Sequence, residues 1–141
     1  MLLSEPKAIV ETWFQTLFTQ GKEEILDNLV APGFIAHGQG NAVEPFGIDD
    51  FKAWLRWYRA TFTDPEWTIH DVITSQDKIV VRYSGWSTYR GGLLDIPCRN
   101  QRVLETGIMI FLILNDKVQE LWCEMSDLQV VQQLGAFPAL K

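Results

Sequence analysis

The chain has 141 residues, of which 47% are hydrophobic and 21% charged. This length and composition predict one globular domain with a sizeable core. The net charge of −6 argues against a nucleic-acid partner and against binding to an anionic membrane surface. The sequence contains no run of about 18 apolar residues, so no membrane-spanning helix is expected.

The chemistry-bearing motifs of common enzymes are missing from the sequence. Its start, "MLLSEPKAIVETW", has neither a basic segment nor a cleavage site, which argues against a signal peptide. Cys98 and Cys123 fit no disulfide framework or metal spacing, and neither has a basic neighbour that would activate it. No phosphate loop or Ser-His-Asp order is present. We therefore expect a cytoplasmic protein without a cofactor or a metal ion.

Helical patterns occupy the first part of the chain. The first helix is predicted to begin at the N-cap Ser4, with Pro6 in its first turn, and to end at Gly21. Its apolar residues come in pairs four positions apart, which predicts one wide buried stripe. A short helix, "KEEILDNLV", and a brief strand, "FIAHG", follow. Asp49 or Asp50 is predicted to cap a third helix, "FKAWLRWYRATF".

Strand patterns occupy the remainder of the chain. The four candidates are "EWTIHDVIT", "KIVVRYSGWSTYR", "QRVLETGIMIFLIL" and "KVQELWCEMSD", with Asn115 and Asp116 as a two-residue hairpin turn. The tail "LQVVQQLG" is predicted to be a closing helical turn or an irregular cover. Helices followed by a meander predict an α+β fold, in which a curved antiparallel sheet wraps around the N-terminal helices as a cone with an internal pocket.

Five stretches resemble the SnoaL-like polyketide cyclase family, within the nuclear-transport-factor-like and ketosteroid-isomerase-like superfamily. They are "LDNLVAPGFIAHG", "GIDDFKAWLRWYRATFTDPEWTIHDVI", "GWSTYRGGLLDIP", "NDKVQELW" and "LQVVQQLGAFP". The resemblance implies the cystatin-like cone, a pocket at its wide end and dimerisation through the outer sheet face. It does not assign a reaction, because this fold hosts isomerases, cyclases, epoxide hydrolases, dehydratases and binding proteins.

The resemblance also suggests site residues. His37 matches the family's histidine after the first short strand, which implies that it faces the pocket, and Trp122 matches the tryptophan of the last strand. Leu121 stands where the family usually has histidine. Ser126 stands where the family has its acid/base aspartate, and Asp127 is one position later.

Two further positions differ from the family's pattern. Met109 replaces an aspartate that the family often carries in the preceding strand. Tyr89 stands where the family often has histidine, so its hydroxyl is expected to supply a polar contact.

Strand alternation provides a separate argument about the acids. If Leu114 pairs with Lys117, then Met109 faces Trp122 and Glu105 faces Ser126. One face of the last two strands then carries both apolar and polar side chains, and this face is the candidate cavity wall. Its residues are Glu105, Met109, Phe111, Trp122, Glu124 and Ser126. Glu124 is predicted to be the pocket carboxylate and Asp127 to point away, unless a bulge near Glu124 returns Asp127 to the cavity.

The aromatic content is high, with six Trp, eight Phe and three Tyr. Such side chains build cores and also line ligand cavities. The predicted pocket therefore contains His37 and at least two aromatic residues from the set Trp54, Tyr58, Trp86, Tyr89 and Trp122. His70, beside Asp71, is expected on the exposed side of a strand.

These observations favour a pocket for a small apolar or cyclic carbonyl compound in a homodimer. The expected chemistry is general acid/base catalysis, in which Glu124 or Asp127 takes a proton alpha to a carbonyl. His37 or a tyrosine would stabilise the enolate oxygen, leading to aldol cyclisation or isomerisation. One alternative is a non-catalytic binding or dimerisation module that has lost the family's acid. Another is hydration or epoxide opening, with Arg82 bridging two acids.

Overall fold

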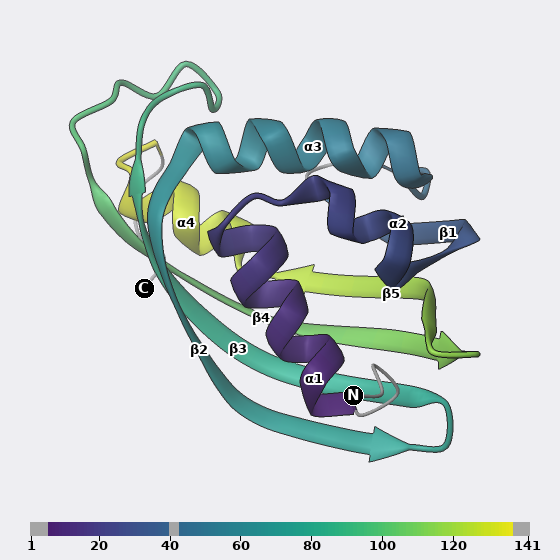
Figure 1. The fold of residues 1–141 in the computed structure, drawn as a ribbon. Coiled ribbons are helices and arrows are strands. Elements are labelled where there is room, and N and C mark those ends of the chain that lie inside the picture. The colour runs from purple at the N-terminus through teal and green to yellow at the C-terminus, as the bar shows by residue number, and fades with distance from the viewer. Residues whose placement is uncertain (1–5, 40–42, 137–141) are drawn as a thin grey trace.

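One strongly curved sheet carries the helices on its concave side (Figure 1). The structure, a computed structural model, describes residues 6–39 and 43–136, so the predicted N-cap Ser4 lies outside the described residues. The α+β architecture predicted from the sequence is confirmed. No helix in the described ranges is long and apolar enough to cross a membrane.

The first helix changes its winding along its length. It begins as the α-helix α1 (Pro6–Glu11) and continues as the π-helix η1 (Thr12–Thr19). The apolar pairs of this helix recur every four residues, whereas an α-helical turn has 3.6 residues. In a regular α-helix, successive pairs would therefore move gradually around the helix axis. The wider π winding corrects this drift. The apolar residues of η1 are all buried: Trp13, Phe14, Leu17 and Phe18.

Two short helices precede the first strand. They are η2 (Glu23–Ile25) and α2 (Leu26–Leu29), and the strand β1 (Val30–His37) follows directly. The helix α3 (Ile48–Thr61) begins at the N-cap Gly47, not at Asp49 or Asp50. Both aspartates instead lie in its first turn, where the helix dipole favours negative charge.

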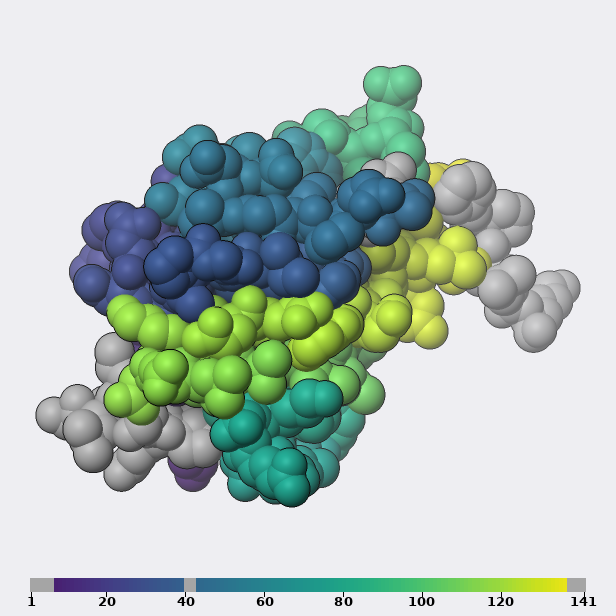
Figure 2. Space-filling model, turned by 90° about the vertical axis from the view of Figure 1, so that its right-hand side faces the viewer, coloured from purple at the N-terminus to yellow at the C-terminus, as the bar shows by residue number. Residues whose placement is uncertain are grey.

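The remaining strands form a meander, as predicted. They are β2 (Phe62–Ser75), β3 (Lys78–Tyr89), β4 (Arg102–Leu114) and β5 (Lys117–Met125), and the helix α4 (Asp127–Gln133) ends the described structure. The sheet order is β1-β5-β4-β3-β2. The four meander strands pair with one another in antiparallel fashion. β1 pairs with β5 in parallel, so the sheet is mixed. Figure 2 shows β1 and β5 side by side beneath α3.

A β-bulge in β5 changes the predicted register of the β4–β5 hairpin. Leu114 pairs with Lys117 as predicted, around a turn in which Asn115 and Asp116 have positive φ. Val118 then pairs with Ile113, but Glu120 pairs with Leu112, so Gln119 is an extra residue. Every later pair is displaced by one position.

The predicted pairs are therefore wrong. Met109 lies opposite Cys123, not Trp122, and Thr106, not Glu105, exchanges hydrogen bonds with Ser126. Because side chains alternate across a strand, the shift moves Trp122 and Glu124 to the face opposite Met109 and Phe111. The inner face of the hairpin includes Met109, Phe111, Leu121 and Cys123, all of which are buried.

The outer face of the sheet carries an apolar row among charged residues. The row crosses four strands and contains Ile73, Val80, Ile110 and Trp122 in register. Ile73 is 59% exposed, and the ion pair of Arg82 and Asp71 lies beside the row. Exposed apolar side chains in such a row favour contact with a second subunit.

We expect the protein to form a homodimer through this outer face. Light scattering at micromolar concentration should give a mass twice that of the 16.2 kDa chain. The substitution Ile73→Glu should give a monomer, because it would bury a carboxylate in the apolar row. Val43→Glu is the matched control, since Val43 is 96% exposed outside the sheet, and should leave the dimer intact. A monomer mass for the unmodified protein would contradict the expectation.

Candidate active site

A cavity of about 460 Å³ opens where α3 and α4 meet the sheet. Trp54, Tyr58 and Phe62 line it from the α3 side, and Glu105 and Met125 line it from the sheet. Asp127, Val130 and Val131 contribute the wall formed by α4. Below it, a small enclosed space reaches into the aromatic core and shares Gln39, Trp54, Tyr58, Glu105 and Met125 with the larger cavity. We call these the outer cavity and the deep cavity.

Glu105 brings a carboxylate to the boundary between the two cavities. The Tyr58 hydroxyl donates to its Oε1 at 2.7 Å, and the Tyr83 hydroxyl donates to its Oε2 at 2.7 Å. Tyr58 comes from α3, Tyr83 from β3 and Glu105 from β4. Gly107 makes this arrangement possible, because a Cβ at that position would lie 2.6 Å from the Tyr83 hydroxyl oxygen.

The surroundings of Glu105 favour its protonated form. Part of the residue contributes to the cavity surface, but the carboxyl group is enclosed by protein. This burial raises its pKa; the hydrogen bonds from Tyr58 and Tyr83 oppose the shift, and the charge of Asp127 adds to it. Burial also raises the pKa of both tyrosines well above the ordinary value, and the nearby Glu105 carboxylate adds to this effect.

Asp127 supplies a second carboxyl group at the mouth of the outer cavity. It is the first residue of α4, and Ser126 is the N-cap. Asp127 is partly open to solvent. Desolvation of its carboxyl group raises its pKa, and the charge of Glu124 adds to the shift. β5 ends at Met125, so strand alternation no longer governs where the Asp127 side chain points.

Four of the predicted site residues therefore line the cavities. Asp127 contacts the outer cavity, Trp54 and Tyr58 contact both cavities, and Met109 lines the deep cavity. The prediction that Asp127 points away from the cavity is wrong. The alternative, in which a bulge directs Asp127 into the cavity, gives the correct side for Asp127. The bulge lies at Gln119, however, and not near Glu124, and β5 ends before Asp127.

Other predicted residues lie on the outer face. Glu124 is exposed there, so its predicted position in the pocket is wrong. His37 stacks on Trp122 with ring centroids 5.5 Å apart, and its Nε2 lies 2.6 Å from Glu120 Oε2. The expectation that His37 and Trp122 face the pocket is thus also wrong. Trp86 is 46% exposed on the same face.

Ser126 and Tyr89 have structural contacts in place of the predicted ligand contacts. The Ser126 Oγ accepts a hydrogen bond from the Thr106 amide at 2.9 Å, which ties the N-terminus of α4 to β4. The buried Tyr89 hydroxyl donates to the Ile96 carbonyl at 2.7 Å. It also accepts from the Leu93 amide at 3.1 Å, so it organises the loop of residues 90–101.

Arg82 does not bridge two acids inside the pocket. Its Nε donates to Asp71 Oδ2 at 2.6 Å on the exposed side of the sheet. This geometry removes the structural basis for the epoxide-opening alternative. His70 is exposed, as predicted, and contacts Ser84.

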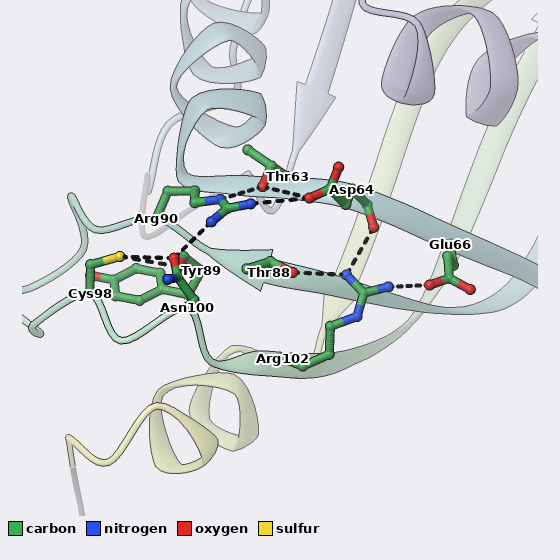
Figure 3. Close-up of polar contacts among 9 residues, drawn as sticks. All are labelled: Thr63, Asp64, Glu66, Thr88, Tyr89, Arg90, Cys98, Asn100 and Arg102. Atoms are coloured by element: carbon green, nitrogen blue, oxygen red, sulfur yellow. Dashed lines mark hydrogen bonds and ion pairs between the residues drawn. The ribbon is translucent and has the colours of Figure 1, made fainter.

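Arg90 holds the loop of residues 90–101 against β2, and Arg102 ties β4 to the same strand (Figure 3). Arg90 donates to Thr63 Oγ1 at 2.7 Å, to Asn100 Oδ1 at 2.7 Å and to Asp64 Oδ2 at 3.2 Å. Arg102 donates to the Asp64 carbonyl at 2.9 Å and pairs with Glu66. Because Leu93 and Leu94 of this loop line the outer cavity, these contacts help to shape its entrance.

Sequence reasoning placed Glu105 on the candidate cavity wall but gave it no chemical role, and it missed Tyr83 and Gln39. A signal for Glu105 was present, since it alternates with Val103, Gly107 and Met109 along an otherwise apolar face. Gln39 directly follows the predicted strand "FIAHG", in the segment of residues 38–48 interpreted as a loop, where no periodic pattern indicates the direction of a side chain. In the described ranges, no group of three or more His, Cys, Asp or Glu residues is arranged to hold a metal ion.

Known structures share this architecture. TsrD from Streptomyces laurentii is 30% identical, with a TM-score of 0.78 over 93% of this chain and 95% of its own. IdmH from Streptomyces antibioticus, a proposed polyketide cyclase, is 19% identical, with a TM-score of 0.81 over 93% and 99%. AclR from Streptomyces galilaeus, a proposed hydroxylase, is 16% identical, with a TM-score of 0.82 over 99% and 86%.

Sequence comparison assigns the family. No curated protein matches the chain. Residues 8–134 match the description SnoaL-like polyketide cyclase, and this range includes every secondary-structure element from η1 to α4. The chain belongs to the SnoaL-like polyketide cyclase family.

Proposed function

We propose that this protein catalyses a cofactor-free aldol cyclisation, or an isomerisation alpha to a carbonyl, on a small flat molecule. The observation that carries the proposal is the pair of carboxyl groups on one aromatic cavity. Glu105 lies at the inner end between two tyrosine hydroxyls, and Asp127 lies at the mouth. When two titratable groups of one site lie in different surroundings, one commonly acts as the acid and the other as the base.

Asp127 has the properties of the general base. Its raised pKa brings the carboxylate closer to the basicity that proton abstraction near neutral pH requires. Its position at the mouth places it against the rim of a bound molecule, and contact with solvent allows the proton to be exchanged after turnover. In the proposed reaction, Asp127 removes a proton from the carbon alpha to a carbonyl.

Tyr58 has the properties of the group that stabilises the enolate. When Glu105 is protonated, its O–H can donate to the Tyr58 oxygen, which frees the Tyr58 hydroxyl hydrogen to donate into the cavity. The enolate oxygen formed by proton abstraction would accept this hydrogen bond. The enolate carbon then bonds to a second carbonyl carbon, and protonated Asp127 returns its proton to the new alkoxide.

The dimensions of the outer cavity support a substrate of one or two rings. Its volume of about 460 Å³ falls within the usual range of small-molecule sites, about 300–1,000 Å³. The stacked rings of Trp54 and Tyr58, with centroids 5.1 Å apart, give it one aromatic wall. Val130 and Val131 provide an apolar wall from α4. Membership of a cyclase family agrees with a carbonyl-rich substrate.

A simple diketone tests the proposal. The protein should convert 1-phenylhexane-1,5-dione into 3-phenylcyclohex-2-enone with loss of water, which ultraviolet absorbance follows. Asp127→Asn should lower kcat by about 10²- to 10⁴-fold, the usual contribution of a general base. Asp77→Asn is the matched control, because Asp77 is exposed in the turn between β2 and β3 and lines neither cavity, and should leave the rate unchanged.

Two results would contradict this assignment. If Glu124→Gln abolished turnover and Asp127→Asn did not, the base would be wrongly identified. If the protein bound the diketone without closing the ring, it would be a binding module and not a catalyst of this reaction.

The pKa shift of Glu105 predicts a pH-dependent difference in stability. Because burial raises its folded-state pKa above the ordinary value of about 4.3, the folded protein holds this proton more tightly than the unfolded chain does. The resulting stabilisation is complete below the unfolded pKa and is lost as the pH rises through the folded pKa. Glu105→Gln removes this titration while keeping polar atoms beside both tyrosines.

Thermal melts from about pH 4 to about pH 8 should therefore show the unmodified protein losing Tm relative to Glu105→Gln as the pH rises. Asp77→Asn serves again as the control, and its Tm difference from the unmodified protein should lack this trend. A relative Tm of the unmodified protein that instead increases with pH would show that the folded-state pKa of Glu105 is lowered.

A further inference from the structure

Gln39 is a buried polar residue that the proposed acid/base steps do not use. It is 2% exposed and lines both the outer and the deep cavity. Among the described residues, its Oε1 has no hydrogen-bond partner. Most buried side-chain polar atoms in folded proteins are hydrogen-bonded, so an unpartnered carbonyl on a cavity wall calls for an explanation.

The backbone fixes the position of Gln39. The preceding Gly38 has φ +86°, and a Cβ there would lie 2.0 Å from the Cys123 carbonyl oxygen. The chain therefore passes directly against β5 as it leaves β1. Burial raises the pKa of the Cys123 thiol, and a hydrogen bond from Gln39 opposes the shift. The Gln39 side chain therefore lies near Cys123, and its oxygen has no hydrogen-bond partner among the described residues.

The same walls also carry unpartnered donors. The indole nitrogens of Trp13, Trp54 and Trp67 are buried without a partner among the described residues. All three residues line the deep cavity, and Trp54 lines the outer cavity as well, as Gln39 does. The boundary between the cavities thus offers one carbonyl acceptor on Gln39 and one N–H donor on Trp54.

A hydroxyl group matches both of these requirements. It donates one hydrogen bond and accepts others, whereas a ligand carbonyl only accepts and cannot satisfy the oxygen of Gln39. A site built to hydrogen-bond a hydroxyl rejects the analogue that lacks it, because the protein's polar atoms then remain unpaired. The aromatic walls favour a hydroxyl attached to a flat ring.

We propose that Gln39, together with Trp54, recognises a hydroxyl group on the flat ring of the ligand and thereby determines which ligands this cavity selects. This inference rests on the proposed function for the carbonyl part of the substrate. The recognition itself depends on the geometry of Gln39 and Trp54. It acts as a specificity-determining contact, because the Gln39 amide touches the ligand but neither gives nor takes a proton in the reaction.

The test compares two ligands that differ in one group. 2-Naphthol and 2-methylnaphthalene have similar shapes, and neither can undergo the proposed reaction. Calorimetric titration of the unmodified protein should show preference for 2-naphthol. Gln39→Met, which keeps the length of the side chain, should reduce this preference by about tenfold by weakening the binding of 2-naphthol. Gln129→Met, at an exposed position of α4, is the matched control and should keep the preference.

The stability of the ligand-free variant separates recognition from a structural role. Gln39→Met removes an unpartnered buried carbonyl, so its Tm should equal or exceed that of the unmodified protein. A lower Tm with an unchanged preference for 2-naphthol would show that Gln39 only supports the fold, and would overturn the proposal. Failure of the unmodified protein to bind either ligand would overturn it as well.

A second variant keeps the proposal testable if Gln39→Met does not fold. Trp54→Phe retains an aromatic ring but removes the indole N–H, and should also reduce the preference for 2-naphthol. An unchanged preference would exclude the donor half of the site. Since binding is measured without turnover, a protein that selects 2-naphthol through Gln39 but leaves the diketone unreacted would contradict the proposed function alone.

Discussion

The carboxyl group of Glu105 joins the helical layer of this protein to its sheet. Through the hydroxyls of Tyr58 and Tyr83 it links α3, β3 and β4 at one point in an otherwise apolar interior. Burying a carboxyl group costs stability unless it is hydrogen-bonded or neutral; here two tyrosine hydroxyls donate to it, and burial raises its pKa. The outer cavity begins at this contact. Tyr58 and Glu105 form its inner end, and it opens from there between α3, the sheet and α4.

The division between the two sheet faces determines what each carboxyl group can do. Glu105 and Asp127 share a cavity with aromatic walls, where desolvation raises the pKa of both and the charge of Asp127 raises that of Glu105 further. Glu120 and Glu124 lie on the outer face; Glu120 contacts His37 there. Acids separated by only a few positions in the sequence thus occupy unrelated environments. A sequence pattern alone does not distinguish them.

The overall fold could be predicted because its signals are periodic and repeated. Paired apolar residues identify the first helix, and the turn at Asn115 and Asp116 identifies the final hairpin. The site depends instead on single-residue events. Gln119 carries no sequence signal for a bulge, and this one position reversed the predicted directions of Trp122 and Glu124. The inward direction of Gln39 depends on the packing of Gly38 against β5, which is a tertiary contact.

The bulge at Gln119 also bears on how the chemistry of such a site can change during evolution. If Gln119 were instead taken into regular pairing, Trp122 and Glu124 would turn to the cavity side of β5 and Cys123 would turn outward, without altering any amino acid. The gain or loss of a bulge is therefore a means of exchanging one set of side chains on the cavity wall for another. In a fold that supports many reactions, a change of strand register next to the site offers a larger functional step than a point substitution does.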